Sequence, residues 1–235
     1  MEKIDPKLYD AIYDFYKEKV GDIKEYYKWN RFPKTEKISA EKKTDYDKAV
    51  WLKKSSSKKL RQKKDYLDTA YTIIQKWGGI NLQKNPCNTE RLSKLKNTLE
   101  KGKYDLDPNV LSSLSKVAAF YDYTKYAVYD SRVAYSLNWI IFKEKLKNPS
   151  FIMKYFPQAS TRNTKLAKYN HKKIFKDAQY LEKKETYEIY CNLLQMIARR
   201  KNISVNDIEM FLFSAAISDV LDEVKDYYKK KKIVV

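Results

Sequence analysis

The sequence predicts an all-α fold, and three observations point to it. Glycine is scarce, with only four among 235 residues, whereas strand-rich folds usually need more glycines in their turns. Apolar residues recur at helical spacing in several long stretches rich in Lys, Glu, Leu, Ala and Asp. Hydrophobic residues make up 43% of the chain and aromatic residues 14%, which is enough to bury a core and excludes a disordered chain.

The N-terminal part predicts two helices with breaks between them. A first helix is expected to begin at Asp5-Pro6, where Asp caps and Pro occupies the first turn, and its apolar face continues to Tyr27. Residues 30–38 are expected to break it, and a second helix is expected over 40–52. The segment KKSSSKK (53–59) is polar and basic, which predicts a loop or a helix joint.

The middle of the chain predicts three helices that lead to a connector. One helix carries apolar residues in register and stops at Gly78-Gly79. A shorter helix is capped by Thr89 and ends at Gly102, and Asp107-Pro108 opens the next helix. Residues 122–129 (DYTKYAVY) then form a short connector with a brief extended pattern.

The C-terminal part begins with an expected helix cap at Asp130. Residues 148–170 contain two prolines and little periodicity, which predicts a long loop. A helix is expected over 172–200. Ser204 is expected to cap one final helix that continues to Tyr228.

The charge and the cysteine content narrow the function classes. The 49 Lys and Arg against 30 Asp and Glu give a net charge of +19, which predicts a polyanionic partner such as nucleic acid. No apolar run approaches the roughly 18 residues of a membrane span, and the N-terminus lacks the apolar stretch of a signal peptide, so a cytoplasmic protein is expected. Two Cys and one His exclude a disulfide scaffold, a zinc finger and a four-Cys cluster. We expect no metal and no cofactor.

The segment 111–142 carries the most information about function. Leu111-Ser112-Ser113-Leu114-Ser115 opens a helix, and the connector then leads to Tyr129-Asp130-Ser131-Arg132-Val133. This order resembles the catalytic region of helix-hairpin-helix DNA glycosylases, in which a hairpin precedes a catalytic Asp at a helix start. The resemblance spans roughly a third of the chain, from Trp77 to Phe142. Serines replace the glycines and the proline of the hairpin, so either a serine-rich turn remains or a continuous helix replaces it.

The resemblance implies a two-lobed helical fold, with lobes at about 39–128 and at 1–38 plus 129–235 and an active cleft between them. Asp130 would then stabilise the positive charge that develops on the sugar and orient the attacking water. Asp is also a favoured helix cap, so its position alone does not separate the two roles. Lys116 is one residue away from the position of the Schiff-base lysine in bifunctional members. It is the candidate amine nucleophile, but we expect no lyase step.

The glycosylase interpretation also predicts residues that hold the base and the DNA. A base that leaves the stack needs a pocket, and aromatic side chains are suitable walls, although core packing is the commoner role of such side chains. The candidates for the base pocket are Trp77, Tyr121, Tyr126, Tyr129, Asn138 and Trp139. The candidate DNA contacts are Ser112, Ser113, Ser115, Arg132, Arg162, Lys165, Lys168 and His171, and His171 is expected to be exposed.

The sequence therefore predicts a monofunctional DNA glycosylase that flips a damaged or modified base out of double-stranded DNA and hydrolyses its N-glycosidic bond. DNA repair and antiviral defence against modified phage DNA are both suitable settings. The alternative is a non-catalytic, basic helical module that binds nucleic acid. A helical nuclease or toxin is disfavoured, because the sequence has no carboxylate cluster for a metal and no R-x-x-x-x-H motif.

Overall fold

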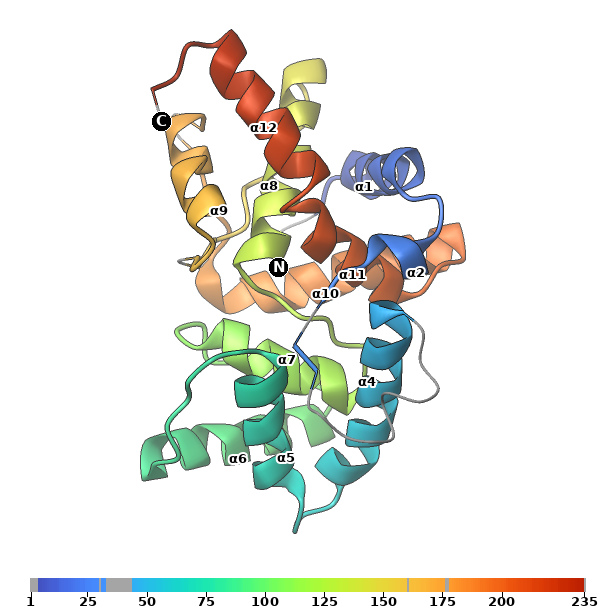
Figure 1. Ribbon diagram of the computed structural model, residues 1–235, viewed down its shortest axis with the longest axis vertical. Coiled ribbons are helices and arrows are strands. Elements are labelled where there is room, and N and C mark those ends of the chain that lie inside the picture. Colours follow the sequence, from blue (N-terminus) through green and yellow to red (C-terminus); the bar gives the residue numbers. More distant parts are fainter. Residues whose placement is uncertain (1–3, 30, 33–43, 160, 176–177, 235) are drawn as a thin grey trace. The chain divides into compact units, whose positions relative to one another are not determined.

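The protein is all-α in a computed structural model that describes residues 4–29, 31–32, 44–159, 161–175 and 178–234 (Figure 1). The chain forms two compact units. Unit 1 consists of Met1–Gly21 and Asp130–Val235, and unit 2 is the continuous segment Asp22–Tyr129. Unit 2 therefore interrupts unit 1 in the sequence. None of the helices in the described ranges has the length and apolar character that crossing a membrane requires.

Unit 1 is built around one buried helix, α8. Every residue of α8 from Val133 to Phe142 is buried, and α8 packs against α1, α11 and α12. Helix α10 packs against α1 and α11 on the other side of the core. The helices of unit 1 are α1 (Pro6–Lys19), α8 (Ser131–Lys147), α9 (Thr164–Lys168), the 3-10 turn η2 (His171–Lys173), α10 (Lys183–Lys201), α11 (Val205–Ala215) and α12 (Asp219–Lys230).

Unit 2 is built around α7, which is buried along almost its whole length. Helix α4 makes the most extensive contact with α7, and α6 and η1 also pack against it. The helices of unit 2 are α2 (Ile23–Tyr26), α4 (Asp45–Arg61), α5 (Tyr66–Thr72), the π-helical turn η1 (Ile73–Trp77), α6 (Pro86–Glu100) and α7 (Leu111–Tyr121).

The loop or helix joint that was expected at 53–59 is wrong, because this segment belongs to helix α4. The helix continues through this segment to Arg61. Lys53, Ser56 and Leu60 are buried on the face that packs against the unit, at spacings of three and four residues. In addition, the Ser57 hydroxyl donates a hydrogen bond to the Tyr121 carbonyl at the end of α7 (2.7 Å). Residues 33–43, which include most of the expected break and the expected helix start at 40, lie outside the described residues.

Several helix boundaries also differ from the expectation. Helix α1 ends at Lys19, and α10 begins at Lys183 rather than near 172. Helix α6 is capped by Asn85 rather than Thr89. The expected final helix is two helices, because the chain leaves helical geometry between α11 and α12. The stop at Gly78-Gly79 is confirmed.

Three of the predicted caps are confirmed. The Asp5 carboxylate accepts a hydrogen bond from Lys7 N–H at the start of α1. Asp130 caps α8, and Ser204 forms a capping box with Asp207 at the start of α11. The start expected at Asp107-Pro108 is wrong by three residues, because the Asp107 side chain closes a turn on Asn109 N–H and α7 begins only at Leu111.

Candidate functional site

Asp130 caps α8 with only one of its two carboxylate oxygens. Oδ1 accepts hydrogen bonds from Arg132 N–H (3.0 Å) and Val133 N–H (3.2 Å). Oδ2 accepts no hydrogen bond from any described residue, and the side chain is half-buried. The N-terminus of a 17-residue helix attracts negative charge, so the helix both holds the carboxylate in place and stabilises it. One oxygen is thus positioned by the fold and remains available to a ligand.

Two further segments of unit 1 contact the first turn of α8. The Arg132 guanidinium lies over the ring of Phe213 on α11, 4.5 Å from the ring centroid. The Gln158 side-chain amide donates a hydrogen bond to the Ser131 carbonyl (3.2 Å). Arg132 remains half-buried rather than fully solvated. Gln158 was not expected at this place, and nothing in the sequence near it indicates the contact.

Two of the six candidate pocket residues, Asn138 and Trp139, are buried inside unit 1. The Asn138 amide forms two hydrogen bonds with the backbone of Phe156: it donates to the carbonyl (2.9 Å) and accepts from the N–H (2.7 Å). Trp139 donates its indole N–H to a carboxylate oxygen of Glu223 on α12 (2.6 Å). Both side chains therefore use their polar groups to hold segments of unit 1 together.

The other four pocket candidates, Trp77, Tyr121, Tyr126 and Tyr129, belong to unit 2, where all are buried. The ring of Trp77 packs edge-on against Phe120 with a centroid distance of 4.8 Å. The Tyr126 hydroxyl donates to the Lys103 carbonyl (3.1 Å). The structure thus places all six candidates in the cores of their units, which is the arrangement that core packing predicts.

The serine-rich segment is the start of a continuous helix and not a hairpin turn. Ser113 N–H already donates to the Val110 carbonyl (2.9 Å), as in a first helical turn. Ser113 and Ser115 are buried. The Ser115 hydroxyl is engaged with the Tyr129 backbone, and the Ser112 hydroxyl accepts a hydrogen bond from Lys116. The expected DNA contact by these serines is therefore corrected for Ser113 and Ser115, whose side chains face the interior.

Lys116 is held inside unit 2. Its side chain is 5% exposed, and Nζ donates to the Ser112 carbonyl (2.8 Å) and to the Ser112 hydroxyl (3.1 Å). Its methylene groups fill the space beside Gly78, where an added Cβ would lie 2.7 Å from Lys116 Cδ. Gly78 ends the π-helical turn η1, and such turns are often found near functional sites. The amine is thus engaged within its own helix.

The segment that follows α8 contains three exposed cations and one buried imidazole. Arg162, Lys165 and Lys168 are exposed on or beside α9, as expected of DNA contacts. The expectation of an exposed His171 is wrong. Its ring is 3% exposed and stacks on Tyr135, with a centroid distance of 4.0 Å. Neither ring nitrogen has a hydrogen-bond partner among the described residues, and burial lowers the pKa of His171 to about 3.

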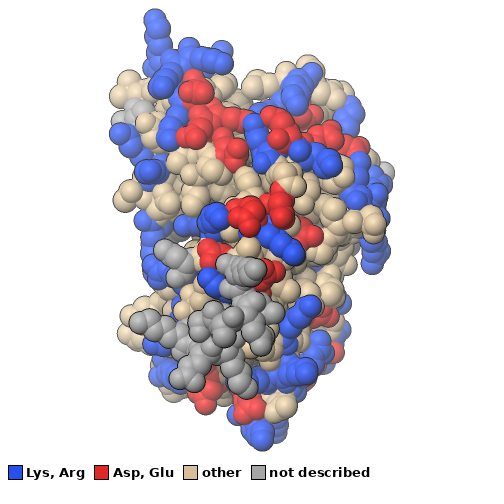
Figure 2. All heavy atoms as spheres, turned by 45° about the vertical axis from the view of Figure 1, so that its right-hand side comes forward, with Lys and Arg blue, Asp and Glu red and all other residues tan. Residues whose placement is uncertain are grey.

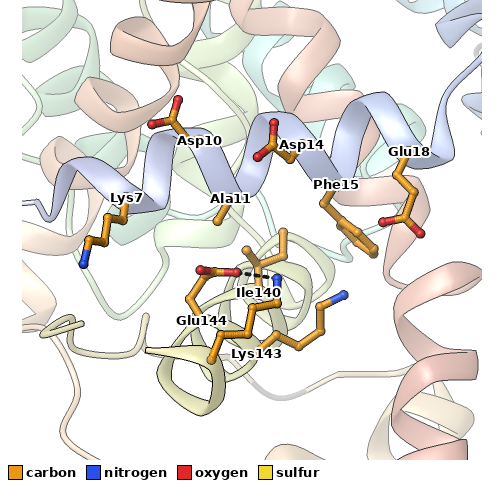
Figure 3. Close-up of a pocket in the computed structure, with 10 residues that line it drawn as sticks. Lys7, Asp10, Ala11, Asp14, Phe15, Glu18, Ile140, Lys143 and Glu144 are labelled. Atoms are coloured by element: carbon orange, nitrogen blue, oxygen red, sulfur yellow. Dashed lines mark hydrogen bonds and ion pairs between the residues drawn. The ribbon is translucent and has the colours of Figure 1, made fainter. Parts of the chain in front are cut away.

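A groove of about 310 Å³ lies between α1 and α8, and its charged residues are four acids and three lysines: Asp10, Asp14, Glu18, Glu144, Lys7, Lys143 and Lys147 (Figure 3). Ala11, Phe15 and Ile140 line it, and the charged groups include Asp14 and Glu144. Figure 2 shows carboxylates gathered around α1, among Lys and Arg side chains, although the chain is strongly basic as a whole. The charges around this groove are therefore of both signs, although the chain as a whole is strongly basic.

No family model matches the chain, and no curated protein and no solved structure matches it either. The fold and the site define a class: a basic, all-α protein with a half-buried carboxylate at the start of its central helix. Within the described ranges, no group of three His, Cys, Asp or Glu side chains is placed to hold a metal ion.

Proposed function

We propose that this protein is a monofunctional DNA glycosylase that hydrolyses the N-glycosidic bond of a damaged or modified base. One observation carries the proposal: the half-buried Asp130 caps α8 through Oδ1, while its Oδ2 accepts no hydrogen bond from a described residue. The second oxygen takes no part in the cap, and the proposal assigns it to the reaction. The order of α7, connector and α8, with Tyr129-Asp130-Ser131-Arg132-Val133 at the junction, supports the same interpretation.

The proposed chemistry needs one carboxylate and one water. As the bond from C1′ of the sugar to the base breaks, its electron pair leaves with the base and positive charge develops on the sugar. The Asp130 carboxylate stabilises that charge, and Oδ2 orients the attacking water and accepts its proton. The net charge of +19, with exposed cations at Arg162, Lys165 and Lys168, supplies the attraction to the DNA backbone.

The alternative function, a non-catalytic module that binds nucleic acid, is favoured by one specific observation. All six aromatic and amide candidates for a base pocket are buried in the cores of their units. A binding module needs the surface cations and no pocket. Release of a free base distinguishes the two functions, because both bind polyanions at low salt.

The test combines base release with a charge-removing variant. The protein is incubated with duplexes that carry damaged or modified bases, including modified phage DNA, and released bases are identified by mass spectrometry. We expect release by the wild type and a loss of at least about 10²-fold in Asp130→Asn. Asn is as good a cap as Asp, so the melting temperature of this variant should stay close to that of the wild type.

Asp5→Asn is the matched control, since Asp5 caps α1 of the same unit through a single oxygen. This variant should keep full activity. Full activity in Asp130→Asn would remove Asp130 from catalysis. Binding of DNA without release of a base from any substrate would favour the binding module instead.

A further inference from the structure

Lys145, Tyr155 and Tyr180 form a cluster at the C-terminal end of α8, called here the Lys145 cluster. The Lys145 ammonium lies 4.3 Å from the centroid of the Tyr155 ring, and the rings of Tyr155 and Tyr180 are 6.1 Å apart. Backbone hydrogen bonds fix the two tyrosines beside each other. Tyr155 N–H donates to the Gln179 carbonyl (2.8 Å), and Leu181 N–H donates to the Tyr155 carbonyl (2.9 Å).

The Lys145 ammonium differs from its neighbours on the same helix. Lys143 forms an ion pair with Glu223 (2.9 Å), and Lys147 forms one with Glu144 (2.8 Å). Among the described residues, Lys145 has neither a carboxylate nor a carbonyl partner, and the Tyr155 ring is its contact. Partial burial lowers the pKa of Lys145, because the charged form loses hydration. The Lys145 ammonium thus has no anionic partner in the part of the chain that the structure describes, and an anionic ligand would offset its lost hydration.

The aromatic part of the cluster presents one ring to solvent. The Tyr155 ring stacks on the ring of Phe175, with centroids 4.4 Å apart and nearly parallel planes. Tyr180 is 40% exposed, so it is one of the few large apolar side chains of the described chain that face solvent. Leu146 and Ile152, in the neighbouring segments of the sequence, are exposed as well. An exposed ring in a cluster that also contains a cation is typical of sites that stack nucleic-acid bases.

We infer that the Lys145 cluster binds one unpaired nucleotide, with the base stacked on Tyr180 and a phosphate oxygen against the Lys145 ammonium. The chemistry of the three side chains matches both halves of a nucleotide, and the basic chain attracts the polyanion that carries it. Asp130 and Lys145 are 15 residues apart on either end of α8, which places them about 22 Å apart along the helix. The inference therefore concerns a second site and does not depend on base excision.

The experiment uses a single-stranded oligonucleotide with one 2-aminopurine in a thymine tract, since stacking on a ring quenches its fluorescence. Binding to the full-length protein is measured for the wild type and for Tyr180→Ser, Tyr180→Phe and Lys145→Gln. We expect Tyr180→Ser to lose the quenching and to bind about 5- to 100-fold more weakly, whereas Tyr180→Phe keeps both. Lys145→Gln should lower the salt dependence of binding by about one counterion.

Lys184→Gln is the matched control, because Lys184 is an exposed lysine of α10 in the same unit. It should leave the quenching unchanged. Quenching and affinity in Tyr180→Ser equal to those of the wild type would overturn the inference, as would the absence of quenching by the wild type. An RNA oligonucleotide of the same sequence shows which nucleic acid is preferred. The readout is binding and not release of a base, which keeps this test independent of the proposed excision.

Discussion

The Ser115 hydroxyl holds the backbone of Tyr129 from both sides. It accepts a hydrogen bond from Tyr129 N–H (3.0 Å) and donates one to the Tyr129 carbonyl (3.1 Å). Ser115 has no exposed surface, and Tyr129 is also buried. Because Tyr129 is the last residue of unit 2, one side chain of α7 fixes the end of the connector that leads to Asp130.

Ser115→Ala should destabilise the protein, because it leaves a buried N–H and a buried carbonyl of Tyr129 without this partner. We expect the free energy of unfolding to fall by about 1–3 kcal/mol, measured by urea denaturation. Ser93→Ala is the control, since the Ser93 hydroxyl forms an exposed hydrogen bond on α6 and its loss should cost less than about 0.5 kcal/mol. Equal effects of the two variants would contradict the importance of the Ser115–Tyr129 contact.

Asn138→Ala should also lower the free energy of unfolding. Such a loss of stability would indicate a structural role for Asn138 rather than a role in a base pocket. Asn138 is 1% exposed, and both ends of its amide are bonded to the Phe156 backbone. Loss of both bonds should lower the free energy of unfolding by at least about 2 kcal/mol. Asn88→Ala, which removes a surface amide bonded to the Gln83 carbonyl, is the comparison. A stable Asn138→Ala protein with impaired base release would instead place Asn138 in a pocket.

His171 makes stability depend on pH. Its pKa is about 3 in the folded protein and near 6.5 when unfolded, so between these values the unfolded chain binds a proton that the folded protein does not. Above about pH 6.5 the protonation of His171 does not change the free energy of unfolding. As the pH drops from there toward 3, this free energy falls. Between pH 7.5 and 5.0 the wild type should lose about 2 kcal/mol through this group alone.

His171→Phe should remove this pH dependence and stabilise the protein, because both buried ring nitrogens lack hydrogen-bond partners in the part of the chain that the structure describes. Urea denaturation of both proteins at several pH values between 5.0 and 7.5 measures the difference. The gain should be largest at pH 5.0. If the free energies of unfolding of the wild type and the variant changed in parallel with pH, folding would not hinder the protonation of His171.

Lys116 should give no covalent adduct when the protein is treated with borohydride in the presence of abasic DNA. A Schiff base needs a free amine, and this amine is buried and donates to Ser112 at two atoms. Gel electrophoresis detects a trapped adduct by its lower mobility. An adduct that appears with the wild type and disappears in Lys116→Met would overturn the expectation of a monofunctional enzyme.

Local chemical signals in the sequence predicted some helix boundaries, namely three helix starts and the stop at Gly78-Gly79. The caps at Asp5, Asp130 and Ser204 each satisfy backbone N–H groups within three residues, so their effect can be recognised without the rest of the fold. The all-α class was predictable for the same reason, because helical spacing is a local property. The stop at Gly78-Gly79 has a similar origin, since Gly79 adopts a positive φ of 63°.

Features that depend on tertiary contacts were not predictable. The segment around Lys53 consists of lysines and serines, yet it is helical because Lys53 and Ser56 are buried against the unit. His171 has lysines as its sequence neighbours, and its burial follows from Tyr135, 36 residues earlier in the chain (171 − 135). For the candidate site, the cap at Asp130 could be predicted, but the open Oδ2 atom could not. It depends on which side chains other segments bring to α8.

The interruption of unit 1 by unit 2 sets the order in which the protein can fold during synthesis. Helix α1 packs against α8 and α10, and the first of these begins 112 residues after α1 ends (131 − 19). At about 5–20 residues per second, a ribosome needs roughly 6–22 s to make that stretch. Unit 2 is complete by then, whereas α1 still lacks its partners. The apolar residues of α1 therefore have no packing partner in unit 1 until α8 and α10 have been synthesised.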